Sequence, residues 1–198
     1  MTIAVDADGN QLKELTTGVT DVNWIQLQSN ADNINADAYI LLNRRIEEWN
    51  DFSKPVIYNS VIETLHEQGS PLNTVRINGW KGFLKRDKWE VAGVINGNIQ
   101  AVFTALKKQP LPVADEPGLI SPRTIAMIIN EAYFALEDKV STKEEIDIAM
   151  KLGTNYPFGP FEWAEQIGKK NIYKLLLKLS ATDKRYVPSM LLKKEAIQ

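Results

Sequence analysis

KLGTNYPFGPFEWAEQIG, residues 151–168, is the stretch that decides the fold of the second half of the chain. Pro157 and Pro160 fix the backbone angle φ, and Gly159 between them permits a sharp turn. Large apolar area can be buried against neighbouring helices by the three aromatic side chains that follow the first proline, Phe158, Phe161 and Trp163. The stretch therefore predicts a rigid turn between helices, with its rings anchoring a helical core.

Two longer helical patterns precede this turn. Ser121 is a good N-cap for a helix that runs to about residue 139, because apolar residues then recur at helical spacing, namely Ile125, Ile128, Ile129, Ala132 and Leu136. A second predicted helix starts with Ser141 and Glu144, which have the spacing of a capping box, and ends at Gly153.

Three shorter helices are expected from the turn onward. Residues 160–167 form a short helical segment, and Asn171 can cap the next helix, whose apolar side contains Ile172, Leu175, Leu176 and Leu179. Pro188 can begin a final helix. Because no strand pattern occurs in this half, residues 117–198 are predicted to form an all-α domain.

The first half of the chain has a different pattern. Short apolar runs typical of strands alternate there with amphipathic helical segments over 60–69 and 96–109. The predicted strands cover residues 2–5, 22–27, 38–42, 54–59, 73–78 and 110–115. Strands that alternate with helices indicate βαβ units and a largely parallel sheet. We therefore expect an α/β domain over residues 1–116.

Composition argues against several functions. The 23 basic and 25 acidic residues nearly cancel, and no Lys/Arg cluster is interleaved with aromatic residues, so nucleic acid is not an expected partner. No apolar run approaches the roughly eighteen residues that span a bilayer, and residues 1–10 lack a signal-peptide pattern, so we expect a cytoplasmic protein with no membrane partner. The absence of cysteine and the single histidine, His66, argue against a metal site.

Residues 117–168 resemble the C-terminal helical domain of the 3-hydroxyacyl-CoA dehydrogenases. The most specific parts of the match are NEA at 130–132, EEIDIAMKLG at 144–153 and the aromatic turn that follows. The resemblance implies a domain that supplies most of a homodimer interface and closes one side of an acyl-CoA cleft. It also implies that residues 1–116 are a truncated, degenerate Rossmann-like domain, because the family's NAD-binding domain is much longer.

Three chemical features of the family are not found in this sequence. The motif G-x-G-x-x-G, whose glycines let a pyrophosphate approach a helix N-terminus, should follow the first strand, but residues 6–15 read DADGNQLKEL. The family's catalytic histidine would fall at Lys81, two residues past Gly79, and its active-site asparagine would fall at Pro122. We therefore expect no cofactor, or NAD held in an unusual way if the chain is an active enzyme.

The resemblance also indicates candidate site residues, each with an ordinary structural alternative. Glu90 could match the glutamate that orients the family's base, or be a half-buried polar residue, and Ser60 could match a substrate-binding serine, or be an N-cap. His66 suits a surface position late in a helix, and Lys81 suits a solvated loop. In the family the aromatic turn lies by the acyl end of the cleft, so three rings are substrate-binding candidates as well as core residues: Phe158, Phe161 and Trp163.

Three hypotheses follow from these residues. The first is a protein of fatty-acid metabolism, related to the 3-hydroxyacyl-CoA dehydrogenases, that has lost redox activity and binds acyl-CoA in an accessory role as a homodimer. The second is an active, minimal NAD-dependent 3-hydroxyacyl-CoA dehydrogenase, and the third is a purely structural dimer without a ligand. Hydride transfer needs a bound nicotinamide and a base near the hydroxyl proton, so the missing glycine motif and histidine favour the first.

Overall fold

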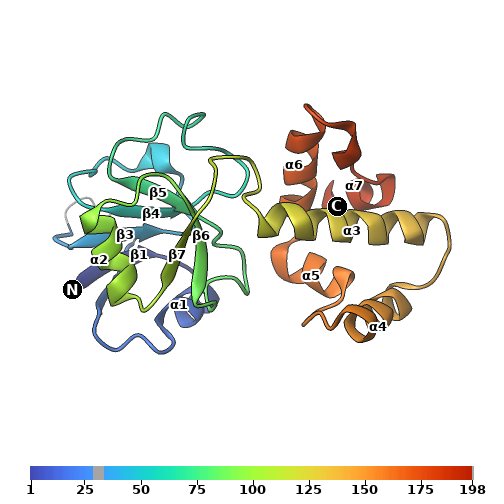
Figure 1. Cartoon of the computed structure of the whole chain (residues 1–198), viewed down its shortest axis with the longest axis horizontal. Coiled ribbons are helices and arrows are strands. Elements are labelled where there is room, and N and C mark those ends of the chain that lie inside the picture. The colour runs from blue at the N-terminus through green and yellow to red at the C-terminus, as the bar shows by residue number, and fades with distance from the viewer. Residues whose placement is uncertain (29–33, 198) are drawn as a thin grey trace. The chain divides into compact units, whose positions relative to one another are not determined.

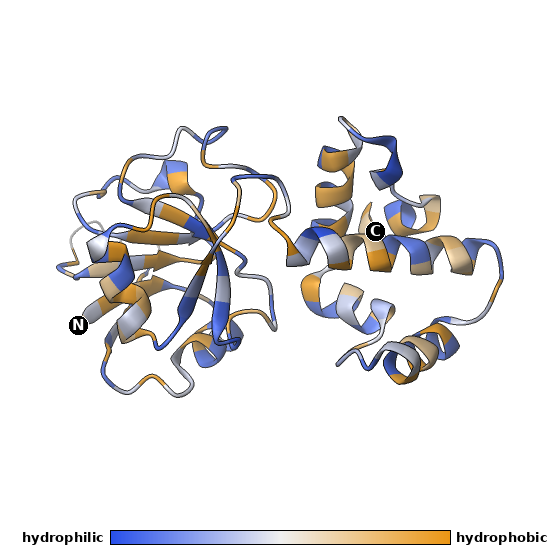
Figure 2. Cartoon of the chain, in the orientation of Figure 1, coloured by the Kyte–Doolittle hydropathy of each residue, from blue (hydrophilic) through white to orange (hydrophobic). Residues whose placement is uncertain are grey.

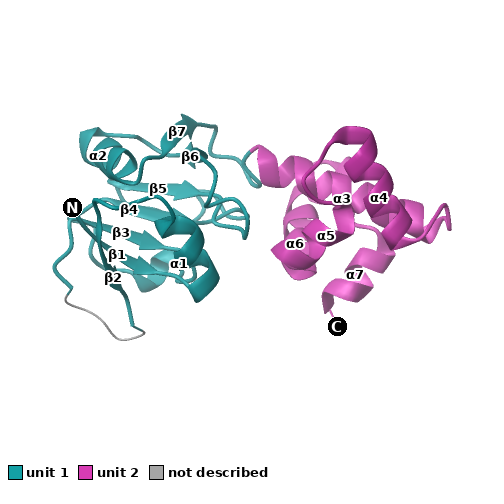
Figure 3. Ribbon diagram, turned by 90° about the horizontal axis from the view of Figure 1, so that it is seen from below, with its two compact units in different colours: residues 1–119 teal, residues 120–198 magenta. Residues whose placement is uncertain are grey.

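The computed structural model describes residues 1–28 and 34–197. These residues form two compact units, 1–119 and 120–198 (Figure 1), which are coloured separately in Figure 3. The first unit is an α/β structure, and the second consists of helices in its described part. Across both described ranges, no helix is long and apolar enough to cross a membrane. The cytoplasmic location stays a prediction.

Unit 1 is built on a seven-stranded sheet in the order β2-β1-β3-β4-β5-β6-β7. All neighbouring strands run parallel except β5 and β6, which are antiparallel. The predicted small, largely parallel, Rossmann-like sheet is therefore confirmed. The elements of the unit are β1 (Thr2–Asp6), α1 (Gly9–Thr16), β2 (Asn23–Gln26), β3 (Ala38–Leu41), η1 (Ile46–Glu48), β4 (Val56–Asn59), β5 (Thr74–Ile77), β6 (Lys88–Ala92), α2 (Gly97–Ala105) and β7 (Gln109–Pro112).

Each face of this sheet has its own apolar cluster, because successive residues of a strand point to opposite faces. One face contains Val75 and Ile77 of β5 and is covered by apolar side chains of α1 and α2. The other contains Val56 and Tyr58 of β4 and is covered by η1 and Trp49. The central strands are hydrophobic over much of their length in Figure 2, as burial on both faces requires.

Several segments of unit 1 differ from the sequence prediction, which contains neither α1 nor η1. Residues 60–69 form turns, not a helix, and the Ser60 hydroxyl donates a hydrogen bond to the carbonyl oxygen of Glu63 at 2.7 Å. Ser60 is therefore not the N-cap of a helix. Strand β6 is not among the predicted strands, although its residues 88–91, KWEV, alternate between polar and apolar as a half-buried strand does.

Unit 2 confirms the predicted helical domain. Its helices are α3 (Ser121–Glu137), α4 (Lys143–Thr154), α5 (Pro160–Ile167), α6 (Lys169–Ser180), η2 (Lys184–Tyr186) and α7 (Met190–Ile197). Helix α3 packs against α5, α6 and α7. The buried Asn130 of the NEA motif donates to the Val187 carbonyl and accepts from the Ser189 backbone N–H, both at 2.9 Å. This asparagine therefore fixes the segment that leads into α7.

The ends of α4 and α6 lie at other residues than predicted. Thr142 and Glu145 form the capping box of α4, one residue later than expected, because the Thr142 side chain accepts from the Glu145 N–H. Asn155 ends this helix in the left-handed conformation, so Gly153 is not the C-terminal cap. Gly168 is the N-cap of α6, while the Asn171 side chain donates back to α5.

Candidate functional site

The carboxyl ends of β1 and β3 meet where the strand order reverses, which is where open α/β sheets bind ligands. The Asp6 carboxylate, at the end of β1, accepts the backbone N–H groups of Asn43 and Arg44 at 3.3 and 2.6 Å. Asp8 caps α1: its carboxylate accepts two N–H groups of the first turn at 2.8 and 2.9 Å, and the Gln11 side chain accepts the Asp8 N–H. The Asp8 carboxylate thus accepts hydrogen bonds from N–H groups that a glycine-rich turn would offer to a phosphate.

A second set of polar residues lies where β4 and β5 end. The parallel register pairs Asn59 with Ile77, and the Ser60 N–H donates to the Ile77 carbonyl at 3.3 Å, so Ser60 lies beside Asn78. The antiparallel register pairs Ile77 with Val91, which places Asn78 opposite Glu90. The side chains of residues paired in this way point to the same face of a sheet.

Continuing this register by one residue places Ser60 and Asn78, which directly follow β4 and β5, in a row with Glu90 of β6. We call these three residues the polar row. It lies on the sheet face of Tyr58 and Arg76, with adjacent members about 5 Å apart. The two catalytic candidates of the sequence are thus two strands apart on one face. Burial lowers the pKa of Arg86, and the negative charge of Glu90 partly offsets this shift.

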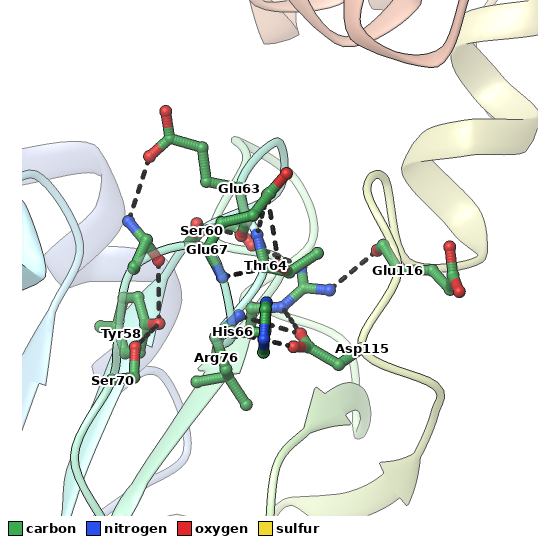
Figure 4. A network of polar contacts seen from close by, with 12 residues as sticks. Tyr58, Ser60, Glu63, Thr64, His66, Glu67, Ser70, Arg76, Asp115 and Glu116 are labelled. Carbon is green, nitrogen blue, oxygen red and sulfur yellow. Dashed lines mark hydrogen bonds and ion pairs between the residues drawn. The ribbon is translucent and has the colours of Figure 1, made fainter. Parts of the chain in front are cut away.

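Arg76 lies one step deeper on the same face and is fully buried. Its guanidinium donates to the Asp115 carboxylate at 2.6 Å, to the Ser60 carbonyl at 2.9 Å and to the Glu116 carbonyl at 2.8 Å (Figure 4). A buried charge is tolerated when it is paired and hydrogen-bonded in this way. Arg76 therefore ties the start of the polar row to the segment that ends unit 1.

The same network holds the turn after Ser60. The Asp115 carboxylate accepts the backbone N–H groups of Leu65 and His66 at 3.1 and 3.2 Å. Burial raises the pKa of Tyr58 to about 12, so its hydroxyl stays protonated and donates to the Gln68 side chain at 2.9 Å. His66 is an exposed residue of this turn and lies outside the polar row, and Lys81 is exposed in the loop after β5.

In unit 2 the aromatic turn is shaped by one carboxylate. Asp147 of α4 accepts the N–H groups of Phe161 and Glu162 at 2.8 and 3.1 Å, and so caps α5 from a neighbouring helix. A Cβ atom on Gly159 would lie 2.3 Å from the Asp147 carboxyl carbon, so only glycine fits there. Burial raises the pKa of Asp147, and the two N–H bonds oppose that shift.

The aromatic side chains of this turn pack within unit 2. Phe161 and Trp163 are buried, whereas Phe158 is half-buried. The Phe161 ring meets the Tyr133 ring edge-on with centroids 5.0 Å apart, and the Trp163 ring lies 5.4 Å from that of Tyr156. These contacts give the rings a structural role. Substrate binding by Phe158, Phe161 and Trp163 stays a prediction.

Sequence reasoning overlooks Arg76, Asn78 and Asp115. The run TVRIN at 74–78 contains a signal for the first two, since a charge and an amide inside a buried strand need partners. Nothing in the sequence links Arg76 to Asp115, because the two are 39 positions apart and meet only through the fold.

Unit 1 is thus a Rossmann-like α/β unit, and a helical unit follows it. Residues 118–196 match the family "3-hydroxyacyl-CoA dehydrogenase, C-terminal domain". The 3-hydroxyadipyl-CoA dehydrogenase of Escherichia coli K12 is 46% identical over 92 residues, which cover 46% of this chain and 19% of that protein. Residues 118–196 are therefore a 3-hydroxyacyl-CoA dehydrogenase C-terminal domain.

The fold of the whole chain agrees with this assignment. The structure of (S)-3-hydroxybutyryl-CoA dehydrogenase from Ralstonia eutropha superposes on 98% of this chain and 92% of its own, with a TM-score of 0.75 and 17% identity. At that identity the likeness concerns the fold alone. In sequence, the matched stretches span only 19%, 23% and 34% of three curated relatives.

The prediction of no cofactor is wrong. The Rossmann-like sheet is an architecture that holds nicotinamide dinucleotides, and the helical unit matches a domain of 3-hydroxyacyl-CoA dehydrogenases. The missing glycine motif therefore does not exclude NAD. The residues present do not fit the glycine-turn mode of binding, because the Asp8 carboxylate caps α1 where the pyrophosphate would lie.

Proposed function

We propose that this chain binds an acyl-CoA thioester in fatty-acid metabolism without carrying out hydride transfer. The observation that supports it most directly is the composition of the polar row, a hydroxyl, an amide and a carboxylate without an imidazole. Such groups can hold a thioester by hydrogen bonds. His66, which lies on an exposed turn, is the single histidine of the chain and is not placed to act as the base.

Binding is tested by calorimetry on the full chain, with acetoacetyl-CoA and free CoA as ligands. We expect the ester to bind more tightly than free CoA, because only the ester has the carbonyl oxygens of an acyl group. Equal affinities would contradict a role for the acyl part. Heat from neither ligand would favour the purely structural dimer.

An active minimal dehydrogenase is the second candidate, and the position of Glu90 favours it. A carboxylate on the face of the polar row can act as a general base when the substrate hydroxyl lies within hydrogen-bond reach. In that case Glu90→Gln would abolish NAD-dependent turnover of a 3-hydroxyacyl-CoA while leaving acyl-CoA binding intact.

We also propose that the chain forms a homodimer through unit 2. Helix α4 exposes Ile148 and Leu152, one helical turn apart, at 52% and 82% of their surface, and Val140 precedes it at 71%. A second copy would cover such side chains. Light scattering should show a dimer that a variant with Ile148→Lys and Leu152→Lys loses. The control Leu72→Lys, in unit 1, should remain dimeric, and a monomeric unaltered chain would refute the proposal.

A further inference from the structure

Asn78 contains a buried hydrogen-bond donor that the chain leaves without a partner. The residue is 8% exposed, and within the described ranges its Nδ2 atom has no hydrogen-bond partner. A buried amide N–H left unpaired costs about 1–3 kcal/mol. Native proteins rarely tolerate this cost without a reason, and ligand recognition is one such reason.

The orientation of this amide is fixed by its other end. The Asn78 Oδ1 atom accepts the Trp80 N–H at 3.1 Å, so Nδ2 must be the unpaired atom. Asn59, on the neighbouring strand, provides a contrast with the same chemistry. Its Nδ2 atom donates to the Leu42 carbonyl at 3.1 Å, and its Oδ1 atom accepts the Gly79 N–H at 2.9 Å. Both the nitrogen and the oxygen of the Asn59 amide are thus hydrogen-bonded, whereas within the described ranges only the oxygen of the Asn78 amide is.

Asn78 is also the middle member of the polar row. Ser60 lies beside it on β4 and Glu90 lies opposite it on β6. A carboxylate neighbour disfavours a second anion at this place, because like charges repel across a few ångströms. A neutral oxygen with a free lone pair is therefore the group that fits the Asn78 donor.

We propose that the Asn78 side-chain N–H is the donor for a carbonyl oxygen of the acyl part of the ligand, and so determines selectivity for the ester over free CoA. The proposal rests on the acyl-CoA binding argued above. Because Nδ2 is buried in the ligand-free chain, binding requires a local rearrangement around Asn78, of the kind that occurs in many complexes.

The test compares Asn78→Thr with Asn59→Thr in the full chain, using acetoacetyl-CoA and free CoA in calorimetry. Threonine at position 78 can still accept the Trp80 N–H but replaces the unpaired donor by a methyl group. Asn78→Thr should weaken ester binding about three- to tenfold, as loss of one neutral hydrogen bond does, and leave CoA binding unchanged. Asn59→Thr should leave the ratio of the two affinities unchanged.

Thermal unfolding without ligand provides a second readout. Asn59→Thr should lower the melting temperature, since two hydrogen bonds are lost, whereas Asn78→Thr should not lower it. If Asn78→Thr does not fold, Asn78→Asp keeps the shape and the Trp80 contact and should also lose the preference for the ester. If a folded Asn78 variant keeps the same preference for the ester, this inference alone is wrong. If the parent chain itself shows no preference for the ester, the proposed function is wrong.

Discussion

At the scale of single residues, close contacts between a glycine and a polar side chain shape both units. Gly159 lies against Asp147 in unit 2, and Gly79 lies against Asn59 in unit 1, where an added Cβ would be 2.7 Å from the asparagine side chain. In both places the polar side chain bonds to backbone N–H groups that the glycine brings within reach. Glycine is needed at both positions, because a side chain there would overlap the neighbouring polar side chain.

Gly159→Ala should therefore destabilise the protein, by about 1–3 kcal/mol in the free energy of unfolding, because the new methyl group overlaps the Asp147 carboxylate. Gly153→Ala is the matched control. Its Cβ would meet nothing within 4 Å and the residue lies in α4, so alanine should stabilise by up to about 1 kcal/mol. Urea denaturation measures both, and equal effects would mean that Asp147 does not restrict position 159.

The second prediction at this scale concerns the contribution of the Arg76–Asp115 ion pair to stability. Asp115→Ala leaves a fully buried guanidinium without its carboxylate and should cost about 3–5 kcal/mol of stability. Glu47→Ala removes one partner of the exposed pair Arg45–Glu47 and should change stability by less than about 0.5 kcal/mol. A small effect of Asp115→Ala in urea denaturation would show that other groups satisfy Arg76.

At the scale of elements, the sequence predicts those helices and strands whose signals lie in neighbouring positions of the chain. Helix α5 has its predicted bounds, because prolines and aromatic spacing are local signals. Segment 60–69 is wrongly predicted as a helix, since its amphipathic pattern is outweighed by bonds to Asp115, a residue about fifty positions away. Two of the three residues in the polar row, Ser60 and Glu90, are candidates from the sequence. Asn78 is not, because its importance depends on strand pairing and burial.

Four helices of unit 2 meet at Glu195 of α7. Its carboxylate accepts bonds from Tyr133 of α3 at 2.9 Å and from Lys143 of α4 at 2.7 Å, and pairs with Lys169 of α6 at 3.1 Å. Burial raises the pKa of Glu195, but the three partners together outweigh that effect and hold its pKa below the ordinary value. The ionised form is therefore favoured by folding.

The stability of the protein should depend on pH through this group. A carboxyl with a lower pKa in the folded state contributes stability above its unfolded pKa and loses it as pH falls through the folded value. Stability should thus fall more steeply on acidification in the unaltered chain than in Glu195→Gln, measured by urea denaturation from neutral pH downward. Parallel curves for the two proteins would contradict the role given to Glu195.

The NEA motif is a second contact between elements. Asn130→Ala should destabilise by about 1–3 kcal/mol, because it leaves a backbone carbonyl and an N–H of the segment before α7 without partners. Asn171→Ala, at an exposed asparagine of α6, is the control and should have a smaller effect. Equal melting temperatures for the two variants in thermal unfolding would contradict this structural role of Asn130.

At the scale of the whole molecule, the two units resemble the related dehydrogenases to different extents. The helical unit matches the family in sequence, whereas the sheet unit has the family's fold without its glycine turn. The polar row contains a hydroxyl, an amide and a carboxylate, and no imidazole. Both observations agree with the proposed ligand recognition without redox turnover.

The absorbance of NADH, followed with the full chain and acetoacetyl-CoA at a concentration that saturates binding in calorimetry, tests this account most directly. The account predicts that the ester stays bound and that the absorbance does not fall beyond the rate without protein. An enzyme-dependent fall that Glu90→Gln abolishes would contradict it and establish an active dehydrogenase.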